Sequence, residues 1–584
     1  MDRQKLFCME FTEHLLSLLI FVPLLAALVL LLIPARLSDA GRWVALIATA
    51  IQILLAVALW AGFRSGAGAP AGVFSPQGYQ FVEKLEWFSL PLGEIGYLSA
   101  DYFVGVDGLS VALVLLAAIV MFIGVISSWT IHQHQKGYFL LYLLLSSTVV
   151  GCFVALDLFL FYLFFEFMLL PMYFLIGMWG GPRRAYASIK FFLYTLAGSL
   201  FILIAIVGLY ISGIDPVATA AHAGVDSAAR VQLMLQEGSL NTRDMVHTFN
   251  MLYLMEPGNL IPGSLLSLQG GGAIWGHSVR LLAFLALMLG FAVKLPAVPV
   301  HTWLPDAHVE APTPVSVVLA AILLKIGGYA ILRIPYSLFP EGAIYYAPLV
   351  AGVGVLSILY GAFNALAQAD LKKMIAYSSV SHMGYVLLGL AALTVEGVSG
   401  ALYQMFSHGL ISAALFLLVG VLYDRTHNRM IDNYGGLARR MPAFTVAVTI
   451  TFFASLGLPG FSGFIAEALV FFGAFRSPSA NGLLPYWMVI IAMLGLIITA
   501  AYYLWTLQRM FFGQFFVREL HWEGSLTDLT PREYFLLVPL LAGMLVLGLF
   551  PNLLLDSFTP AVDAFVQGVL ERGRSNLVLL TRFL

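Results

Sequence analysis

The chain has 584 residues, of which 60% are hydrophobic and only 10% are charged, and its mean hydropathy is +0.92. Soluble proteins carry about 25% charged residues, so the composition excludes a soluble globular protein and predicts a polytopic membrane protein. The formal net charge of −2, without a basic patch, argues against a nucleic-acid partner, and two cysteines, Cys8 and Cys152, provide neither a disulfide set nor an iron–sulfur site.

Fourteen apolar segments follow one another, each close to the length of about 20 residues that a membrane-spanning helix needs. They cover residues 14–34, 43–63, 107–130, 137–155, 157–178, 188–211, 279–299, 312–334, 345–368, 372–394, 397–423, 442–475, 485–512 and 534–556. Runs of this length are far too long for barrel strands, so we predict an all-α fold. We expect the first segment to be a membrane helix and not a cleaved signal peptide, because no A-x-A-like site follows it.

The sequence contains an internal repeat. FFLYTLAGSLFILIAIVGLY (191–210) resembles QMFSHGLISAALFLLVGVLY (404–423), and the break at Leu295-Pro296 resembles the one at Leu458-Pro459. Spans 4–8 and 9–13 are therefore predicted to form two five-helix copies, and an odd number of spans per copy makes them inverted. Each copy has one discontinuous helix, span 7 or span 12, and such pairs place ion sites near the membrane midplane.

These patterns divide the chain into four parts. Residues 1–136 hold spans 1–3 and a long outer loop (64–106), and residues 137–334 hold the first copy with an inserted loop (212–278). Residues 345–512 hold the second copy, and residues 513–584 hold the last helix and a C-terminal tail. Neither long loop indicates a second folded domain, although 227–255 can form a helix or two.

Short loops rich in Lys or Arg predict the orientation in the membrane. The pairs Arg183–Arg184, Lys372–Lys373 and Arg439–Arg440 lie in short loops on one side of the predicted bundle, and positive short loops stay in the cytoplasm. We therefore expect both termini on the outer, periplasmic side of a bacterial inner membrane.

Lys294 is the most informative residue, because it lies in an apolar segment two residues before Pro296. A lysine at mid-depth in a bilayer costs roughly 2.5–3.5 kcal/mol on insertion scales, so its presence indicates function. The proline frees backbone carbonyls, which are tolerated only inside protein or beside a wet cavity. Charge and helix break together predict an ion or proton site, and Pro459 marks the equivalent break in span 12.

Further ionisable residues that fall inside predicted spans and away from their ends are Glu166, Lys325, His382, His408 and Glu467. Burial disfavours the charged form of an ionisable group, so these residues are suited to exchange protons near neutral pH. A carboxylate that approaches or leaves a lysine loads or unloads its proton, which predicts a proton relay without a cofactor. The alternatives are structural: an ion pair for the carboxylates and lysine, and packed polar groups bonded to backbone for the histidines.

The segment HTWLPDAHVEAP (301–312) contains His301, Asp306, His308 and Glu310, a combination that can ligate a metal. We favour a short loop whose side chains cap helix ends, and we predict no metal site. P-loop, H-E-x-x-H, G-x-G-x-x-G and nucleophile-elbow motifs do not occur, so we predict neither a cofactor site nor chemistry on an organic substrate in this chain.

These motifs resemble those of the antiporter-like membrane subunits of respiratory complex I, over about residues 100–515. The matching segments are GVDGLS (105–110), the span with Glu166, KLPAVPVHTWLPDAHVEAPTPVSVVLAAILLKIGGY (294–329), DLKKMIAYSSVSHMGY (370–385), FSHGL (406–410) and LGLPGFSGF (456–464). The glutamate at position 467, where sister subunits typically carry a lysine, indicates which of these antiporter-like subunits the chain resembles most. The loop 212–278 is longer than the family usually has.

The resemblance implies a proton-translocating subunit of NADH:quinone oxidoreductase. It implies that Glu166 and Lys294 form a modulating pair and that Lys325 is the central lysine. His382 and His408 would continue the path, and Glu467 would be the terminal site. FMN, iron–sulfur clusters and quinone would lie in other subunits, and the partners would be neighbouring antiporter-like subunits and lipid.

Three alternatives share these motifs or explain them differently. The chain could belong to a multisubunit Na+/H+ antiporter, for which we expect lysine at position 467, or to a membrane-bound hydrogenase-type complex. A purely structural scaffold is the remaining alternative.

Overall fold

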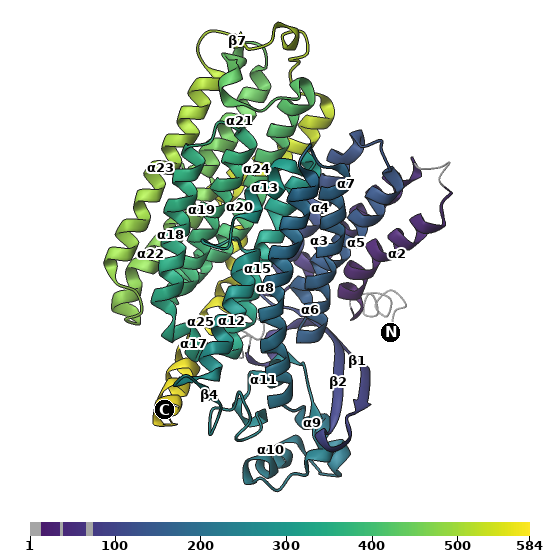
Figure 1. Cartoon of the computed structure of the whole chain (residues 1–584), viewed down its shortest axis with the longest axis vertical. Coiled ribbons are helices and arrows are strands. Elements are labelled where there is room, and N and C mark those ends of the chain that lie inside the picture. The colour runs from purple at the N-terminus through teal and green to yellow at the C-terminus, as the bar shows by residue number, and fades with distance from the viewer. Residues whose placement is uncertain (1–12, 35–38, 66–73, 584) are drawn as a thin grey trace.

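The structure is a computed structural model that describes residues 13–34, 39–65 and 74–583. Helices pack side by side in a tall bundle, and a smaller layer of strands and short helices covers one end (Figure 1). We call this the hairpin end, because it carries the hairpin of β1 (Gln80–Pro91) and β2 (Tyr97–Val106), and we call the other the basic end.

The helices occur in the predicted order. The first three spans are α2 (Leu15–Leu32), α3 (Ala40–Gly62) and α4 (Val111–Ser127). The first copy contains α5 (Gln135–Val154), α6 (Leu158–Phe167) with α7 (Leu169–Trp179), α8 (Arg184–Ser212), α12 (Val279–Lys294) with α13 (Trp303–Glu310), and α14 (Thr313–Val318), which continues through a π-helical segment (Leu319–Leu323) into α15 (Leu324–Arg333). The short helices α16 (Pro335–Leu338) and α17 (Pro340–Tyr345) lead to the second copy.

The second copy contains α18 (Ala347–Leu366), α19 (Leu371–Ala392), α20 (Val395–Thr426), α21 (Pro442–Ser455) with α22 (Ser462–Ala480), and α23 (Tyr486–Phe511). The chain closes with α24 (Pro531–Leu549) and α25 (Asn552–Phe583). In both copies the fourth span is the divided one, at the two places where the sequence predicts a break.

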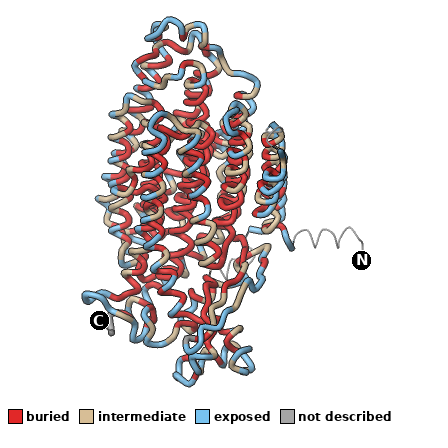
Figure 2. Tube along the Cα trace, turned by 45° about the vertical axis from the view of Figure 1, so that its right-hand side comes forward, coloured by how far each residue is buried: buried red, intermediate tan, exposed pale blue. Residues whose placement is uncertain are grey.

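Thirteen helices of the described ranges are long and apolar enough to cross a membrane. The halves α12 and α21 fall short of that length because each is part of a divided span, whereas α25 meets the criterion by length and composition. Residues in the interior of the bundle are buried, and exposed residues concentrate at its surface and its two ends (Figure 2). The predicted all-α membrane fold is confirmed.

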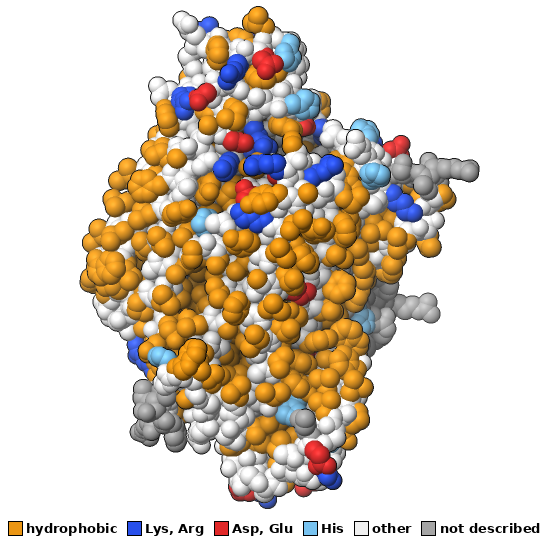
Figure 3. All heavy atoms as spheres, in the orientation of Figure 1, with side chains coloured by type: hydrophobic (Ala, Val, Ile, Leu, Met, Phe, Trp, Pro, Cys, Tyr) orange, Lys and Arg blue, Asp and Glu red, His pale blue; other side chains and the backbone are white. Residues whose placement is uncertain are grey.

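The surface of the bundle carries a broad apolar band, and Lys and Arg gather above it, toward the basic end (Figure 3). Large apolar side chains on α3, α8 and α23 are well exposed, among them Leu54, Ile204 and Ile497. An apolar surface of this extent on a soluble protein would drive aggregation, so the band is typical of a membrane protein.

The two long loops form one layer at the hairpin end, built from strands that the sequence analysis did not predict and from short helices. β1 pairs antiparallel with β2, and β2 pairs in parallel with β3 (Val246–His247) of the second loop. The helices α9 (Pro216–Ala223), α10 (Ala228–Glu237) and α11 (Met251–Leu254) complete the layer, so helices within 227–255 are confirmed. β4 (Ala273–Ile274) and β5 (His277–Ser278) pair in a short hairpin. At the basic end, β6 (Tyr434–Gly435) pairs with β7 (Phe516–Val517), which is far away in the sequence (Figure 1).

The last predicted span, 534–556, corresponds to α24, whereas the predicted tail forms a second helix, α25, after Pro551. The hydroxyl of Ser65, three residues after α3, donates to the carbonyl of Asp556 near the start of α25. Near its other end, Asn576 bonds to Glu341 of α17. Both partners lie at the hairpin end of the bundle, so α25 lies across that end and is not a further crossing.

Two closed ion pairs are buried near the hairpin end. Arg333 Nη2 lies 2.6 Å from Asp107 Oδ1, and Arg280 Nε lies 2.6 Å from Glu341 Oε1. All four side chains are at most 4% exposed. Each charge is compensated at contact distance, and the pairs join the start of α4 to α15 and the start of α12 to α17.

We expect Arg333→Met to destabilise the protein strongly, because it leaves the Asp107 carboxylate buried without its partner, at a cost of about 3–5 kcal/mol. Arg243→Met is the matched control, since Arg243 and Glu94 form an ion pair in which both side chains are more than half exposed. That change should cost about 0–1 kcal/mol. Thermal unfolding of the purified complex measures both, and equal shifts would contradict the expectation.

Candidate functional site

Lys294 is the last residue of α12, and its side chain is only 2% exposed. Its Nζ lies 5.0 Å from the ring centroid of Phe165 and 5.7 Å from that of Phe191, so aromatic faces replace part of the lost hydration. Nζ finds no hydrogen-bond acceptor among the described residues. The ammonium group is therefore held in place without a fixed counter-ion.

The helix stops at Lys294 because Pro296 lacks an N–H and its ring blocks a further turn. The N–H of Ala297 reaches back to the carbonyl of Ala292 at 2.9 Å, and the N–H of Val298 donates to Ser357 Oγ of α18 at 3.0 Å. Both donors that the break releases are thus satisfied inside the protein, as a bilayer requires.

The break is also packed closely against the next span. A Cβ on Gly327 of α15 would lie 2.6 Å from the backbone nitrogen of Leu295, so only glycine permits this approach. The close packing holds the end of α12 against the helix that carries Lys325.

Glu166 lies on α6 and is partly exposed, but its Oε1 is buried without a hydrogen-bond partner in the described structure. Lys294 and Ser199 of α8 are its electrostatic neighbours. No ion pair within 4.0 Å joins Glu166 to Lys294 among the described residues, so the predicted pair is adjacent and open.

Lys325 is fully buried on α15, directly after the π-helical segment. Its Nζ donates to the carbonyl of Ala320 at 2.6 Å and lies 2.7 Å from His408 Nδ1 of α20. A π turn shifts each backbone hydrogen bond by one residue and leaves carbonyls free, which explains why Ala320 can accept from a side chain here. Lys325 is therefore bound to neutral acceptors and to an imidazole, and to no carboxylate.

The path continues from His408 through His382 to Glu467. The rings of His408 and His382 have centroids 5.3 Å apart, and His382 Nδ1 lies 3.6 Å from Glu467 Oε1. All three side chains are nearly inaccessible. Four of the six predicted residues thus form one contiguous line across α15, α20, α19 and α22.

Glu467 is placed by the second break. Leu458 N–H returns to the carbonyl of Phe453 at 3.0 Å, and Gly457 and Gly460 have φ of +76° and +97° on either side of Pro459. Gly457 faces the Glu467 carboxylate so closely that a Cβ there would overlap Oε2. Positive φ and the absence of a side chain are both needed at Gly457, which accounts for glycine at this position.

No polar contact joins the Lys294–Glu166 pair to Lys325 among the described residues. The two halves meet through the backbone contact of Leu295 with Gly327. The predicted residues therefore form a pair and a line of four, packed against each other.

Uncharged polar residues complete the line, and sequence reasoning missed them. Gln404 lies 3.2 Å from His382 Nδ1, and Ser455 lies 3.3 Å from its Nε2. Ser455 donates in turn to Tyr503, which donates to Ser378. Serine, glutamine and tyrosine are common in membrane helices, so no sequence signal distinguishes these from packing residues.

Residues Trp303–Glu310 of the segment 301–312 form the short helix α13 in place of the predicted loop. Asp306 pairs with Lys190 of α8 at 2.7 Å. Glu310 accepts from the N–H of Arg183, directly before α8, at 2.8 Å, so this carboxylate caps a helix end as predicted. His308 stacks on Phe416 with centroids 4.4 Å apart. Across the described residues no group of three His, Cys, Asp or Glu is arranged to hold a metal.

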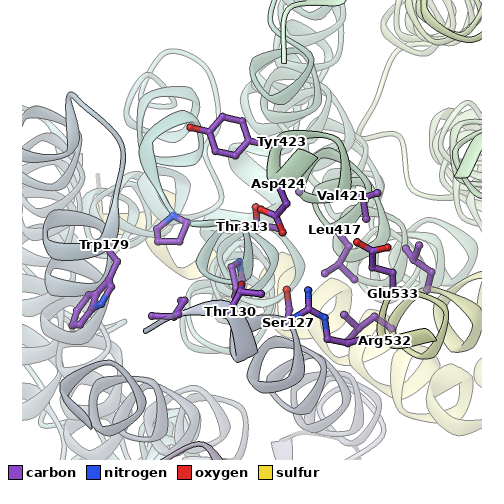
Figure 4. A pocket seen from close by; sticks show the side chains of 16 residues that line it. Ser127, Thr130, Trp179, Thr313, Leu417, Val421, Tyr423, Asp424, Arg532 and Glu533 are labelled. Carbon is purple, nitrogen blue, oxygen red and sulfur yellow. The ribbon is translucent and has the colours of Figure 1, made fainter. Parts of the chain in front are cut away.

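Two adjoining cavities open toward the basic end. The larger, about 230 Å³, lies between α4, α14, α20 and α24, with Asp424 and Glu533 facing it from one side and Trp179 from the other (Figure 4). The smaller, about 170 Å³, shares Trp179 and is lined by Lys372 and Arg429. Both are lined by mixed polar and apolar side chains.

Residues 155–499 match the family model described as NADH:quinone oxidoreductase/Mrp antiporter, transmembrane. The chain belongs to this family. The match contains all six predicted site residues and both breaks.

Curated relatives within the family are similar over nearly the whole chain. NADH-quinone oxidoreductase subunit M of Rhodobacter capsulatus is 41% identical over 559 residues, which cover 95% of this chain and 97% of that protein. NAD(P)H-quinone oxidoreductase chain 4 3 of Trichormus variabilis is 38% identical, with 93% and 89% covered. The predicted resemblance to an antiporter-like subunit of NADH:quinone oxidoreductase, of the subunit M type, is confirmed.

Solved structures show the same fold. A chain of respiratory complex I from Thermus thermophilus with bound NADH has a TM-score of 0.71 at 28% identity, and 95% of this chain and 99% of that chain are covered. A chain of the Mrp complex from Dietzia sp. has a TM-score of 0.70 at 21% identity, with 96% and 99% covered. The second likeness shows the fold alone.

We expect Gly457→Ala to impair proton translocation, because the added Cβ displaces the Glu467 carboxylate. Gly460→Ala is the matched control: its φ is equally unfavourable for alanine, but nothing lies within 4 Å of the added atom. NADH-driven proton uptake by membrane vesicles, normalised to assembled complex, should fall clearly further for Gly457→Ala. Equal losses would mean that backbone strain, and not the position of Glu467, matters.

Proposed function

We propose that the chain moves protons across the membrane through Glu166, Lys294, Lys325, His408, His382 and Glu467, as the subunit M-type member of an NADH:quinone oxidoreductase. Family membership and the relatives at 36–41% identity support the complex, and the line of buried groups supports the route. Redox chemistry with FMN, iron–sulfur clusters and quinone belongs to other subunits in this proposal.

One observation carries the proposal: the site lysines have no carboxylate partner at contact distance. Arg280 and Arg333, equally buried, are each 2.6 Å from a carboxylate oxygen. Lys294 and Lys325 contact aromatic rings, a carbonyl and an imidazole instead. A structural role needs a closed pair, because an uncompensated buried charge costs stability. Groups left open in this way are suited to gain and lose protons.

The open Glu166–Lys294 pair provides the switch. When the carboxylate approaches, it favours the ammonium form and holds a proton on Lys294, and when it recedes, burial favours release. Glu166 and Lys294 lie on different helices, and α12 ends at Lys294 beside the break. A small movement of α12 relative to α6 therefore changes the charge state without any cofactor.

The proton leaving Lys294 has an acceptor line ahead of it. Lys325, His408 and His382 can each donate and accept, and the His382–Glu467 separation of 3.6 Å is short enough for transfer after a slight shift or through one water. Glu467 is the terminal site, which passes protons outward or toward the next subunit.

Orientation and partners complete the proposal. The basic end, with Arg183, Lys372 and Arg439, faces the cytoplasm, and both termini lie on the outer side. The cavities lined by Asp424 and Lys372 then open to the cytoplasm and are the entrance for protons. Neighbouring antiporter-like subunits and lipid contact the apolar band.

A Na+/H+ antiporter subunit is the competing function. Glutamate at position 467, in place of the lysine expected there in the antiporter, weighs against it. The two functions are distinguished by the rate of NADH oxidation. A rate that responds to de-energisation of the membrane and is unaffected by Na+ supports the proton-translocating subunit, and a rate that depends on Na+ supports the antiporter subunit.

We expect Glu166→Ala and Lys294→Ala to lower both NADH:quinone turnover and the proton gradient by about ten-fold or more, as for loss of a proton-transfer group. Native gels establish that the complex has assembled. Glu94→Ala is the control, because Glu94 forms an exposed ion pair at the hairpin end. Normal turnover and a normal gradient in both variants would exclude the relay at this pair.

A further inference from the structure

We propose that Arg574 and Asn576 of α25 are positioning residues for proton translocation, because they hold the outer ends of both divided spans. The proposal rests on the proposed function and names the contact that sets the two site helices relative to each other. We call residues 572–576, with the sequence RGRSN, the strap contact.

Asn576 reaches the start of α12. Its Nδ2 donates to Glu341 Oε2 at 2.9 Å, and Glu341 Oε1 accepts from Arg280 Nε at 2.6 Å. Arg280 also donates to the carbonyls of Leu266 and Leu338. The side chains of Asn576, Glu341 and Arg280 are at most 7% exposed. The first turn of α12 is therefore fixed to α25 by a buried, charge-assisted network, the stronger class of hydrogen bond.

Arg574 reaches the end of α22. Its Nη2 donates to the carbonyl of Asn481, the residue that follows α22, at 3.2 Å. The side chain of Asn481 donates to the carbonyls of Ala392 and Leu393 at the end of α19, at 2.9 Å each. The strap contact thus also reaches α19, which carries His382.

Helix geometry explains how two residues on one helix serve two spans. Positions two apart on an α-helix point about 200° away from each other, so Arg574 and Asn576 extend to opposite sides of α25. Gly573 lets α25 approach α17, because a Cβ there would lie 2.6 Å from the Pro340 carbonyl. α25 therefore sits between the two outer ends that it joins.

The two site residues stand at equal distances from this contact. Lys294 lies 14 residues after Arg280 along α12, and Asn481 lies 14 residues after Glu467 along α22. At a rise of 1.5 Å per residue each separation is about 21 Å of continuous helix. A shift of α12 or α22 at the strap contact therefore moves Lys294 or Glu467 by a similar amount, because a helix transmits axial movement along its length.

Two further contacts anchor α25, one before the strap contact and one at its first residue. Phe74 stacks on Phe565, with centroids 6.4 Å apart and an interplanar angle of 5°. Arg572 donates to the carbonyl of Met255 in the layer at the hairpin end, at 3.0 Å. These contacts keep the helix from moving freely with either span. Through these contacts α25 holds the helices of Lys294 and Glu467 in fixed positions relative to each other.

The test uses the assembled complex in native membranes. Asn576→Asp places a second carboxylate beside Glu341, and Arg574→Ala removes the exposed hydrogen bond to Asn481. Asn576→Leu removes the bond to Glu341 without adding a charge and leaves the Arg280–Glu341 pair closed. Gln567→Ala is the matched control on the same helix, because Gln567 is exposed and bonds only to Asp563 one turn away.

Two readouts decide: amide hydrogen exchange of α12 and α22, and protons translocated per NADH oxidised. We expect Asn576→Asp and Asn576→Leu to speed exchange in the first turns of α12, and Arg574→Ala to speed exchange in the last turns of α22. Each of these variants should lower the number of protons per NADH, and Gln567→Ala should keep native values. Unchanged exchange in the contacted span, or an unchanged proton ratio in Arg574→Ala, overturns the proposal.

A failed relay gives a different result. In that case Glu166→Ala and Lys294→Ala pump normally, while the exchange measurement still reports whether the strap contact holds both spans. The two proposals therefore fail separately.

Discussion

The rest of the structure depends on two lysines, Lys294 and Lys325, that are buried in the helix bundle without a carboxylate at contact distance among the described residues. Arg280 and Arg333 are buried against carboxylates and behave as fixed structural pairs. Lys294 and Lys325 are buried just as deeply, but rings, a carbonyl and an imidazole surround them. Such sites are expensive, and the protein tolerates them because the rest of the bundle is closely packed and its other buried pairs are closed. Lys372 is a third buried lysine of this kind, and its Nζ donates to the carbonyl of Ala311 at 2.6 Å.

The helix breaks are the structural means of placing these groups. A continuous helix offers no free backbone group at mid-membrane, whereas the breaks at Pro296 and Pro459 end α12 and α21 there and let the chain turn. Ser357 satisfies one released donor, and Gly327 and Gly457 provide the room. Because the copies are inverted, Lys294 is the last residue of a helix that begins at the hairpin end, and Glu467 lies near the start of a helix that ends there. The layer of α25 and β1–β2 then becomes a common frame for both.

The sequence was sufficient for the spans, the breaks and the six ionisable residues, because each leaves a local signal: length, proline, or a charge in an apolar run. Contacts between distant segments left none. His408 meets Lys325 across 83 residues, and Ser455 meets His382 across 73, both through ordinary polar side chains. α25 was predicted as a tail because charged residues interrupt its apolar pattern, yet two of them, Arg572 and Arg574, bind the hairpin end. The pairing of β2 with β3 joins two loops that each look irregular alone.

In the proposed relay, Glu467 changes its protonation state during turnover. Infrared difference spectroscopy of the complex, triggered by NADH and performed with 13C-labelled glutamate, detects the carbonyl band of a protonated carboxyl group. We expect a labelled-glutamate band that appears or disappears on reduction and is missing in Glu467→Gln, with assembly unchanged. A difference spectrum that is the same in the native complex and in Glu467→Gln would contradict it.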